Sequence, residues 1–477
     1  MEEIIALAKR RGFFYPSSEI YGGLANTWDF GHYGTLLKNN LRDLWWKNFV
    51  LTRHDMVGIE ASTFLNTKAW EASGHVAGFT DSMIDCKNCN TRTRADHLIE
   101  DYLDKTPDNK LIMDSFLELS EEKFEEVKKT KKVEGFTEAQ LDALIRGLQI
   151  PCPKCKSFNW TPVRKFNLLF ETSIGIVEES KSKAYLRGEI AQGIFLNYKN
   201  VLDTMRVKVP FGIAQVGKAF RNEITMGQAI YRTLEFDLME FEYLIQEKDW
   251  EKQFEYWKDQ LWQFAKLIGL DMTRLRWREH EEFERAHYSK RTVDLEYQFP
   301  FGWKEMWAVA YRTNFDLSNH TKHSGVDLSY RDPQTNEKYI PHVIEPTFGL
   351  SRMVLVMMHN AYHEEEVNGK KRVVLKFDPK IAPIKAAIFP LQKDEKLREL
   401  AESVYNDMKG EIVTEFDDAG NIGKMYRRQD EIGTPFCIVV DYDSLEDKKV
   451  TVRDRDTMKQ ERISLDTLKE YIKARVA

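Results

Sequence analysis

The chain has 477 residues, 31% of them charged, and a formal net charge of -6. This length exceeds what one hydrophobic core organises, so roughly two to four domains are expected. The two signs of charge are interspersed, which is typical of a globular protein and argues against a chain that binds nucleic acid along its whole length, although local basic patches remain compatible with it.

The N-terminal residues Met1–Ile5 lack the basic flank and the apolar run of a signal peptide. The longest apolar run, near Met353–Met358, is far shorter than the ~20 residues of a membrane helix. We therefore expect a cytoplasmic protein with no membrane partner. Residues 12–80 and 160–360 are rich in aromatic and β-branched residues broken by Gly and Pro, which predicts one domain built on an antiparallel sheet with intervening helices.

Two Cys-x-x-Cys pairs lie between these flanks, Cys86 with Cys89 and Cys152 with Cys155. In a reducing compartment such pairs supply four thiolates to a tetrahedral zinc ion, and the long gap predicts an insertion pinned at its base by the metal. The alternative is four reduced thiols of a degenerate site; a redox role is disfavoured because no thioredoxin-like unit surrounds the pairs. Cys437, in an apolar run, is expected in a buried strand.

The insertion is predicted to carry two helices. From about residue 115 to 150 the chain is highly charged with Phe116, Leu119, Phe124 and Val127 at helical spacing, and Thr137 to Gln140 fits a capping box. Beyond the insertion, the residue pattern predicts strands at 207–211, 236–245, 292–299 and 306–311, and a helix from Gly349 through Met358.

Residues 366–383 are predicted to form a linker, with a turn at Asn368–Gly369 and interruptions at Pro379 and Pro383. The last hundred residues alternate between strands at 386–389, 412–416 and 436–440 and helices at 397–408, near Tyr426 and at 465–474, which predicts a small α/β domain. The chain contains neither Gly-x-Gly-x-x-Gly nor a Gly-rich loop ending in Lys-Ser or Lys-Thr, so the two commonest nucleotide folds lose support.

Two arginines indicate an enzyme that binds and uses ATP without either of these nucleotide-binding motifs. Arg221 and Arg352 each follow a short apolar stretch, as at the end of a strand or the start of a helix. A rigid backbone at such a place holds a planar guanidinium ready for bidentate phosphate binding. For either arginine alone, an ordinary salt bridge is the alternative.

The residues around these arginines resemble class II aminoacyl-tRNA synthetases. Residues 220–223 and 231–240 look like motif 2, Gly349 to Arg352 like motif 3, and 31–46 like the motif 1 helix at a dimer interface. The specific form resembles the homodimeric glycyl-tRNA synthetases, in the segments at 94–97, 167–172, 312–317, 345–347 and 423–435. The resemblance covers nearly the whole chain.

This resemblance implies an α+β fold in which a class II antiparallel sheet with flanking helices forms the catalytic domain. That domain would comprise residues 1–85, with motif 1, and 160–378, with motifs 2 and 3. Residues 86–159 would be the insertion with its zinc knuckles and helices, and 379–477 an α/β anticodon-binding domain. The protein would be a homodimer.

The resemblance also implies an ATP site. Arg221 would bind the α-phosphate and Arg352 the γ-phosphate, with Arg352 also on the far face of an adenine that stacks on Phe236. Glu223 would accept from the adenine amino group, and Glu305 would lie on the side of the Mg²⁺ ion that bridges the phosphates. For Phe236 and Glu305 the alternatives are a plain core residue and a solvated strand residue. Arg232 would be a second clamp on the phosphate tail, and the remaining contacts that the resemblance implies for ATP are Asn222, Tyr231, Met306 and Gly349.

Glycine offers no side chain, so its site must hold an ammonium and a carboxylate and leave no room beside the α-carbon. The resemblance implies that acids surround the ammonium, and that Arg94 and Arg312 oppose the substrate carboxylate or the acyl phosphate. Phe236 and Gly349 would contribute here too, and Thr347 stands where close relatives often have Ser. Surface charge is the alternative for the candidate acids, which are Glu171, Glu240, Glu296 and Glu345.

The implied activity is glycine–tRNA ligation: glycine and ATP give glycyl-adenylate and pyrophosphate, and the glycyl group then passes to the 3′ end of tRNA(Gly). The C-terminal domain would read the anticodon, using Lys424, Arg427 and Arg428 beside Tyr426; a solvated helix face is the alternative. Two other functions compete. One is a class II synthetase for proline, threonine, serine or histidine, which the acidic pocket disfavours, and the other is a non-catalytic relative, which would usually lose the motif arginines.

Overall fold

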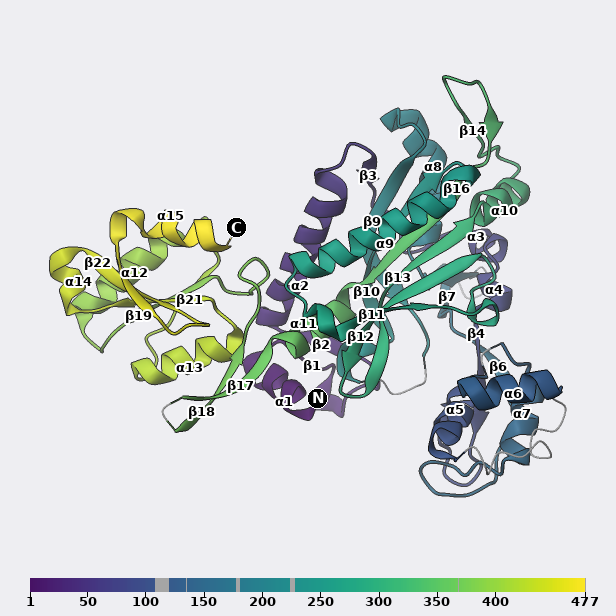
Figure 1. Cartoon of the computed structure of the whole chain (residues 1–477), viewed down its shortest axis with the longest axis horizontal. Coiled ribbons are helices and arrows are strands. Elements are labelled where there is room, and N and C mark those ends of the chain that lie inside the picture. The colour runs from purple at the N-terminus through teal and green to yellow at the C-terminus, as the bar shows by residue number, and fades with distance from the viewer. Residues whose placement is uncertain (108–119, 134, 177–180, 224–227, 368, 477) are drawn as a thin grey trace.

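A seven-stranded sheet forms the centre of the molecule. The structure, a computed structural model, describes residues 1–107, 120–133, 135–176, 181–223, 228–367 and 369–476. It has the predicted mixed α+β architecture: a central body carries a helical lobe on one side and a C-terminal α/β lobe on the other (Figure 1). The central strands lie in the order β11-β12-β13-β16-β10-β9-β3, and all neighbours are antiparallel except β3 and β9. Their bounds are β3 Met56–Gly58, β9 Phe211–Phe220, β10 Glu235–Ile245, β11 Leu275–Glu279, β12 Arg291–Phe299, β13 Gly302–Thr313 and β16 His342–Gly349.

One face of this sheet is apolar and packs on helices α2 (His32–Trp46), α9 (Trp250–Leu267) and α11 (Leu350–Ala361). Aromatic rings fill the interface: Phe49 of the segment after α2 lies 5.6 Å from Phe241 and 5.3 Å from Phe348, between ring centroids. Helix α2 is the segment predicted as motif 1. Its Gly34 passes so close to the backbone of Phe13 that a Cβ would meet the carbonyl oxygen at 1.8 Å, which explains the glycine.

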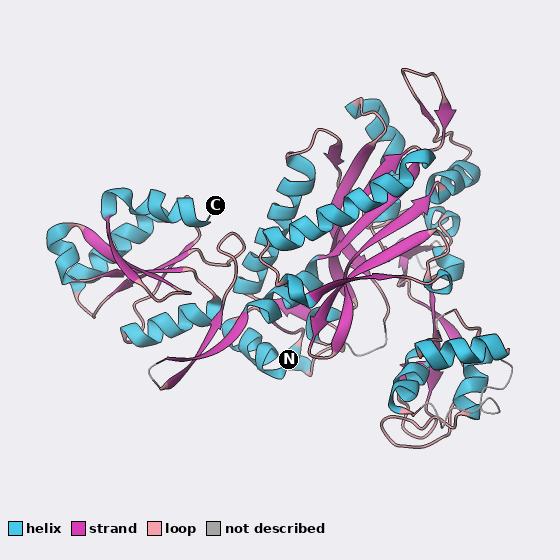
Figure 2. Cartoon of the chain, in the orientation of Figure 1, coloured by secondary structure: helices cyan, strands magenta, loops and turns pink. Residues whose placement is uncertain are grey.

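The remaining elements of the central body surround this core (Figure 2). Two short antiparallel pairs lie outside the sheet, β1 with β2 and β7 with β8, and a third pair, β14 with β15, forms a projecting hairpin. The elements are α1 Glu2–Arg11, β1 Phe14–Pro16, β2 Trp28–Phe30, α3 Thr67–Ala72, α4 His75–Gly78, β7 Glu171–Ile174, β8 Ser182–Tyr185, α8 Ala191–Met205, α10 Phe315–Ser324, β14 Tyr330–Arg331 and β15 Lys338–Tyr339.

The predicted strands at 236–245, 292–299 and 306–311 and the helix after Gly349 are confirmed. The prediction of a strand at 207–211 is wrong, because the strand begins only at Phe211. Arg206 ends α8 in the left-handed conformation, and Pro210 has no N–H to donate to a ladder. The apolar residues that suggested a strand, Val207 and Val209, instead pack from a loop onto a second core.

The helical lobe has its own core. Its sheet has the strand order β5-β4-β6, and the helices that come between β5 and β6 in the chain pack around Ile99, Val127 and Leu144. The predicted capping box is confirmed, since the N–H of Gln140 donates to Thr137 Oγ1 at 3.3 Å and the N–H of Thr137 to Gln140 Oε1 at 3.0 Å. The predicted positions Phe116 and Leu119 lie outside the described residues. The elements are β4 Thr80–Asp85, β5 Arg92–Arg94, α5 Ala95–Lys105, α6 Glu121–Thr130, α7 Glu138–Gly147 and β6 Arg164–Asn167.

The C-terminal lobe is the predicted α/β unit. Its sheet runs β20-β19-β21-β22-β23, with the first three strands parallel and the last two antiparallel. Cys437 lies buried on β21 as expected, and burial raises the pKa of its thiol to about 12. The antiparallel strands and α14 were not predicted. The elements are β19 Ala386–Pro390, α12 Glu395–Met408, β20 Thr414–Phe416, α13 Ile422–Ile432, β21 Phe436–Val440, α14 Tyr442–Asp447, β22 Lys449–Asp454, β23 Gln460–Ser464 and α15 Leu465–Val476.

The predicted linker is wrong in its first part, where β17 (Tyr362–Val367) and β18 (Lys370–Leu375) form a hairpin. Asn368 of the expected turn lies outside the described residues. The hairpin is fixed to the C-terminal lobe, because Arg372 donates to both carboxylate oxygens of Asp430 on α13 at 2.8 and 2.9 Å. Across the described residues, no helix combines the length and apolarity needed to traverse a bilayer.

Candidate active site

A cavity of about 350 Å³ opens on the face of the central sheet opposite the aromatic core. Side chains of a strand alternate between the two faces, so Glu240 and Glu242 of β10 share the polar face while Phe241 between them packs in the core. The antiparallel register then places Glu240 beside Thr347 of β16, and Thr347 beside Ala308 of β13. Residues that are far apart in the chain therefore lie side by side on the face of the sheet that lines the cavity.

Arg221 and Arg352 both line this cavity. Arg221 directly follows β9, where its N–H donates to the carbonyl of Leu234 at 2.9 Å and its Nε to the carbonyl of Gly188 at 3.1 Å. Its guanidinium carbon lies 5.4 Å from the centroid of the Phe236 ring, within the range of a cation–π contact. Backbone contacts on two sides thus fix the position of this charge.

Arg352 lies in the first turn of α11, where Tyr231 and Glu305 hold it. Its guanidinium carbon is 4.3 Å from the Tyr231 ring centroid, and Nη1 donates to the Glu305 carbonyl at 2.9 Å and lies 3.1 Å from the carboxylate. The guanidinium of Arg352 therefore lies over the Tyr231 ring. Burial opposes ionisation of Glu305, but Arg352 beside it lowers its pKa, so this acid stays charged.

Glu223 and Arg232 form an ion pair of 3.0 Å on the cavity wall. The two residues enter and leave the loop of the predicted motif 2, so the pair closes the base of that loop. A segment near the N-terminus supports it: the side-chain amide of Asn26 donates to the Glu223 carbonyl at 3.3 Å, and the carbonyl of Asn26 accepts from Leu234 at 2.9 Å.

An acidic cluster forms the innermost end of the site. Oxygens of Glu240, Glu242 and Glu345 lie within 4.8 Å of one another. Burial raises the pKa of Glu345 to about 7, and burial together with the charge of Glu345 raises the pKa of Glu240 and of Glu242 well above the usual range. Among the described residues, Oε1 of Glu240 and both carboxylate oxygens of Glu242 have no hydrogen-bond donor. The cluster is therefore short of positive charge and of donors, which suits a small cation with several N–H groups.

Arg312 balances part of this charge. Its side chain is 0% exposed and donates to Asp316 at 2.8 and 2.9 Å and to Glu345 at 2.7 Å, while Glu189 lies 3.6 Å away. The guanidinium thus lies under the cavity, without lining it.

Residues 385–475 match the family described as anticodon binding domain, and residues 81–168 match glycyl-tRNA synthetase insertion domain 1. The glycine–tRNA ligase of Clostridium tetani is 50% identical over 477 residues, and that of Caldanaerobacter subterraneus subsp. tengcongensis is 49% identical over 476. The glycine–tRNA ligase of Clostridium acetobutylicum is 48% identical over 477 residues; each alignment covers 100% of this chain and 98% of the relative. The chain belongs to the glycine–tRNA ligase family.

Several residues predicted for a glycine–tRNA ligase site do not line the cavity. Glu171 is exposed on β7 with Lys183 at 2.7 Å, and Glu296 is paired with Arg276 at 2.6 Å. Met306 packs in the main core, on the other face of the sheet. Asn222 is bound through its N–H to Leu168, and Arg94 is paired with Asp81 and Asp96 near the base of the insertion. The predicted residues that do line it are Arg221, Glu223, Tyr231, Arg232, Phe236, Glu240, Glu305, Glu345, Thr347, Gly349 and Arg352.

Sequence reasoning missed two groups of polar residues in this part of the glycine–tRNA ligase fold. Glu242 is buried beside Glu240, behind the residues that line the cavity. Its position could have been predicted from the two-residue alternation along β10, which puts it on the same face as Glu240. His280 and Asp294 line the cavity as a pair, with His280 Nε2 2.8 Å from Asp294 Oδ2. No local motif marks this pair, because Asp294 lies on β12 whereas His280 directly follows β11, and the two meet only where these neighbouring strands pair.

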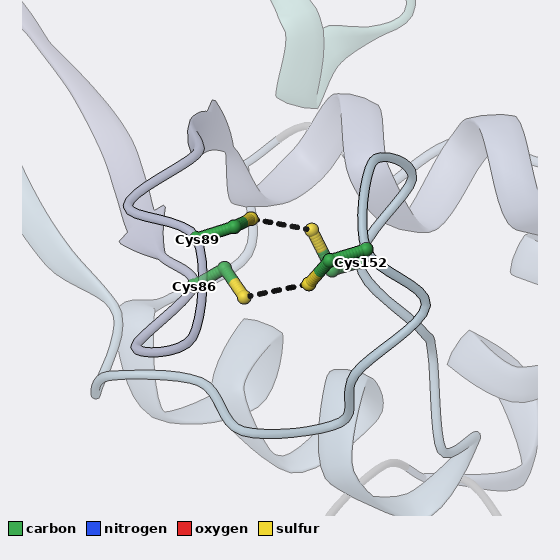
Figure 3. Close-up of side chains that lie close together, drawn as sticks. Cys86, Cys89 and Cys152 are labelled. Atoms are coloured by element: carbon green, nitrogen blue, oxygen red, sulfur yellow. Dashed lines mark hydrogen bonds between the residues drawn. The ribbon is translucent and has the colours of Figure 1, made fainter.

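The four paired cysteines meet in the insertion of this glycine–tRNA ligase relative, where Cys86 and Cys89 face Cys152 across a small gap (Figure 3). Both loops have the same hydrogen bonds: the first cysteine donates its N–H to the residue five positions later and accepts at its carbonyl from the residue four positions later. The Sγ atoms of Cys86 and Cys155 are 3.5 Å apart, and those of Cys89 and Cys152 are 3.6 Å apart. Four sulfurs at ~2.3 Å from a central zinc would be about 3.8 Å apart, so this set fits a tetrahedral zinc ion.

Proposed function

We propose that this protein is a homodimeric class II glycine–tRNA ligase, which joins glycine to ATP as glycyl-adenylate, releases pyrophosphate, and transfers the glycyl group to the 3′ end of tRNA(Gly). The observation that carries the proposal is one cavity with guanidinium groups along its wall and a buried acidic cluster at its inner end. Family membership supports the same activity.

In the first step, a carboxylate oxygen of glycine attacks the α-phosphate of ATP as pyrophosphate leaves. The substrate carboxylate is already ionised at neutral pH, so the protein needs no base here and contributes orientation and positive charge. Arg221 is assigned to the phosphate under attack and Arg352 to the departing tail. Glu305, whose carboxylate remains charged, is the residue suited to hold Mg²⁺, which would neutralise phosphate charge when bound. Phe236 offers the ring on which adenine stacks.

The acidic cluster is assigned to the ammonium group of glycine. A bound ammonium supplies the donors that Glu240 lacks, and the hydroxyl of Thr347, 3.4 Å from the Glu240 carboxylate, helps to orient that acid. An added methyl group in such a confined site costs about 1–3 kcal/mol, which is the basis for rejecting alanine.

The homodimer is supported by an exposed apolar segment ahead of α2. Ile20 and Tyr21 are 89% and 88% exposed and Leu24 is 61% exposed, an arrangement expected where a second copy covers the surface. Binding of tRNA is supported by the match of the C-terminal lobe to anticodon binding domains. On α13, Lys424 and Arg427 are exposed, whereas Arg428 is bonded to Asp417 and Tyr426 packs against Phe389, so the first two are the better candidates for RNA contact.

Exchange of labelled pyrophosphate into ATP, measured with each amino acid in turn, tests the function. We expect exchange that depends on glycine. Exchange driven instead by proline, threonine, serine or histidine would identify a synthetase of other specificity, and no exchange with any amino acid would favour a non-catalytic relative.

We also propose that the four cysteines hold one structural zinc ion. Elemental analysis of freshly purified protein should find about one zinc per chain, because structural sites of this type close around a single metal. The Cys152→Ser variant should lose the metal. Cys437→Ala, which changes a thiol on β21 far from the cluster, is the matched control and should keep it. Purified protein without zinc would contradict the assignment.

A further inference from the structure

His280 and Asp294 form a polar pair on the cavity wall to which the activation step assigns no role. Asp294 lies on β12 with its side chain 8% exposed, and His280, directly after β11, has a side chain 20% exposed. Their contact, 2.8 Å from Nε2 to Oδ2, has the geometry of a carboxylate that orients an imidazole. Both residues line the same cavity as Arg221 and Glu240.

The backbone fixes His280 in this position. Its N–H donates to the carbonyl of Thr292 on β12 at 3.0 Å, and its own carbonyl accepts from Nε and Nη2 of Arg285, both at 3.2 Å. Since Nε2 faces the Asp294 carboxylate, the neutral ring carries its proton on Nε2. Nδ1 is then left with a lone pair, the form of imidazole that accepts a proton.

The transfer step has a requirement that activation lacks. A ribose hydroxyl at the 3′ end of the tRNA must lose its proton as its oxygen attacks the carbonyl carbon of glycyl-adenylate. We propose that His280 accepts this proton at Nδ1 and that Asp294 is its positioning residue. The hydroxyl O–H bond breaks and an ester C–O bond forms, while the bond between the acyl carbon and the phosphate oxygen breaks and AMP leaves with the electron pair. This role rests on the proposed glycine–tRNA ligase activity.

The charges around the pair suit this role. Burial lowers the pKa of His280, but the hydrogen bond and charge of Asp294 raise it, and the net shift is upward. Arg278 of β11, with Nη1 4.0 Å from Asp294, acts in the opposite direction, and Glu284 of the short helix Glu282–Glu284 acts with Asp294. The pKa of Asp294 is raised to about 6, mainly by burial and further by the nearby charge of Glu305 on β13. An imidazole of raised pKa is a stronger proton acceptor once it is neutral.

The test separates the two steps in the full-length protein. His280→Asn should leave glycine-dependent pyrophosphate exchange within about 3-fold of wild type, while single-turnover transfer from preformed glycyl-adenylate to tRNA(Gly) falls about 100-fold or more. His54→Asn, which changes an exposed histidine outside the cavity, is the matched control and should alter neither rate. Normal exchange in the variant also shows that it is folded.

The pH profile identifies the proton acceptor. Wild-type transfer should rise with pH as His280 loses its proton and then level off, and His280→Asn should remove that rise. Asp294→Asn takes away the charge that raises the pKa of His280, so the midpoint of the rise should move to lower pH. Unchanged transfer in His280→Asn, an equal loss of exchange and transfer, or an unmoved midpoint in Asp294→Asn would each overturn the assignment. Failure of glycine-dependent exchange in the wild type would instead overturn the proposed function.

Discussion

Replacing Arg221 with alanine should reduce glycine-dependent pyrophosphate exchange by about 100- to 1,000-fold, the loss typical of removing one fixed donor from a transition state. The guanidinium is held ready by the carbonyl of Gly188 and by its place directly after β9. Charge develops on the α-phosphate only during attack, so the lost contact should lower kcat more than it raises the KM for ATP.

Two comparisons make this result specific. Arg221→Lys keeps a positive charge but loses the planar fork, so its activity should lie between wild type and Arg221→Ala. Arg398→Ala removes a guanidinium that is paired with Glu402 and Asp418 on the surface of the C-terminal lobe, and should leave exchange unchanged. An Arg221→Ala enzyme that retained wild-type exchange would remove this arginine from the mechanism.

Replacing Arg312 with methionine should lower the free energy of unfolding by about 3–5 kcal/mol, the cost of breaking a buried ion pair on one side only. Methionine fills a similar volume, but it leaves the carboxylates of Asp316, Glu345 and Glu189 buried without their shared cation. Urea unfolding followed by tryptophan fluorescence would measure the change as a lower midpoint at similar slope.

The control for this measurement is Arg331→Met on the projecting hairpin, where the side chain is exposed and bonds only to Asn336 among the contacts of the described residues. It should alter the free energy of unfolding by less than about 0.5 kcal/mol. An Arg312→Met protein as stable as wild type would show that water or a neighbouring side chain neutralises the three acids.

The sequence predicts the elements whose residue patterns are strong and local. Strand β10 follows from its alternation and α7 from its capping box, while the arginines after β9 and at the start of α11 follow from the motifs that contain them. The pair of His280 and Asp294 could not be predicted in this way, because the two residues meet through the register of β11 and β12. Hairpin β17–β18 was missed for a related reason. Its strands carry several charged residues, and the buried Arg372 among them is paired with Asp430 of the C-terminal lobe, a contact that no local pattern reveals.

Helix α13 has exposed basic side chains near its start and ion pairs to other parts of the chain at its end. Near its start, Lys424 and Arg427 face solvent; at its end, Asp430 binds Arg372 of the hairpin and Glu431 lies 2.7 Å from Arg11 of α1. An α-helix of this length is stiff, so it moves as a short rigid rod. The two ion pairs at the end of α13 therefore oppose rotation of the C-terminal lobe against the N-terminal helix α1 and hairpin β17–β18.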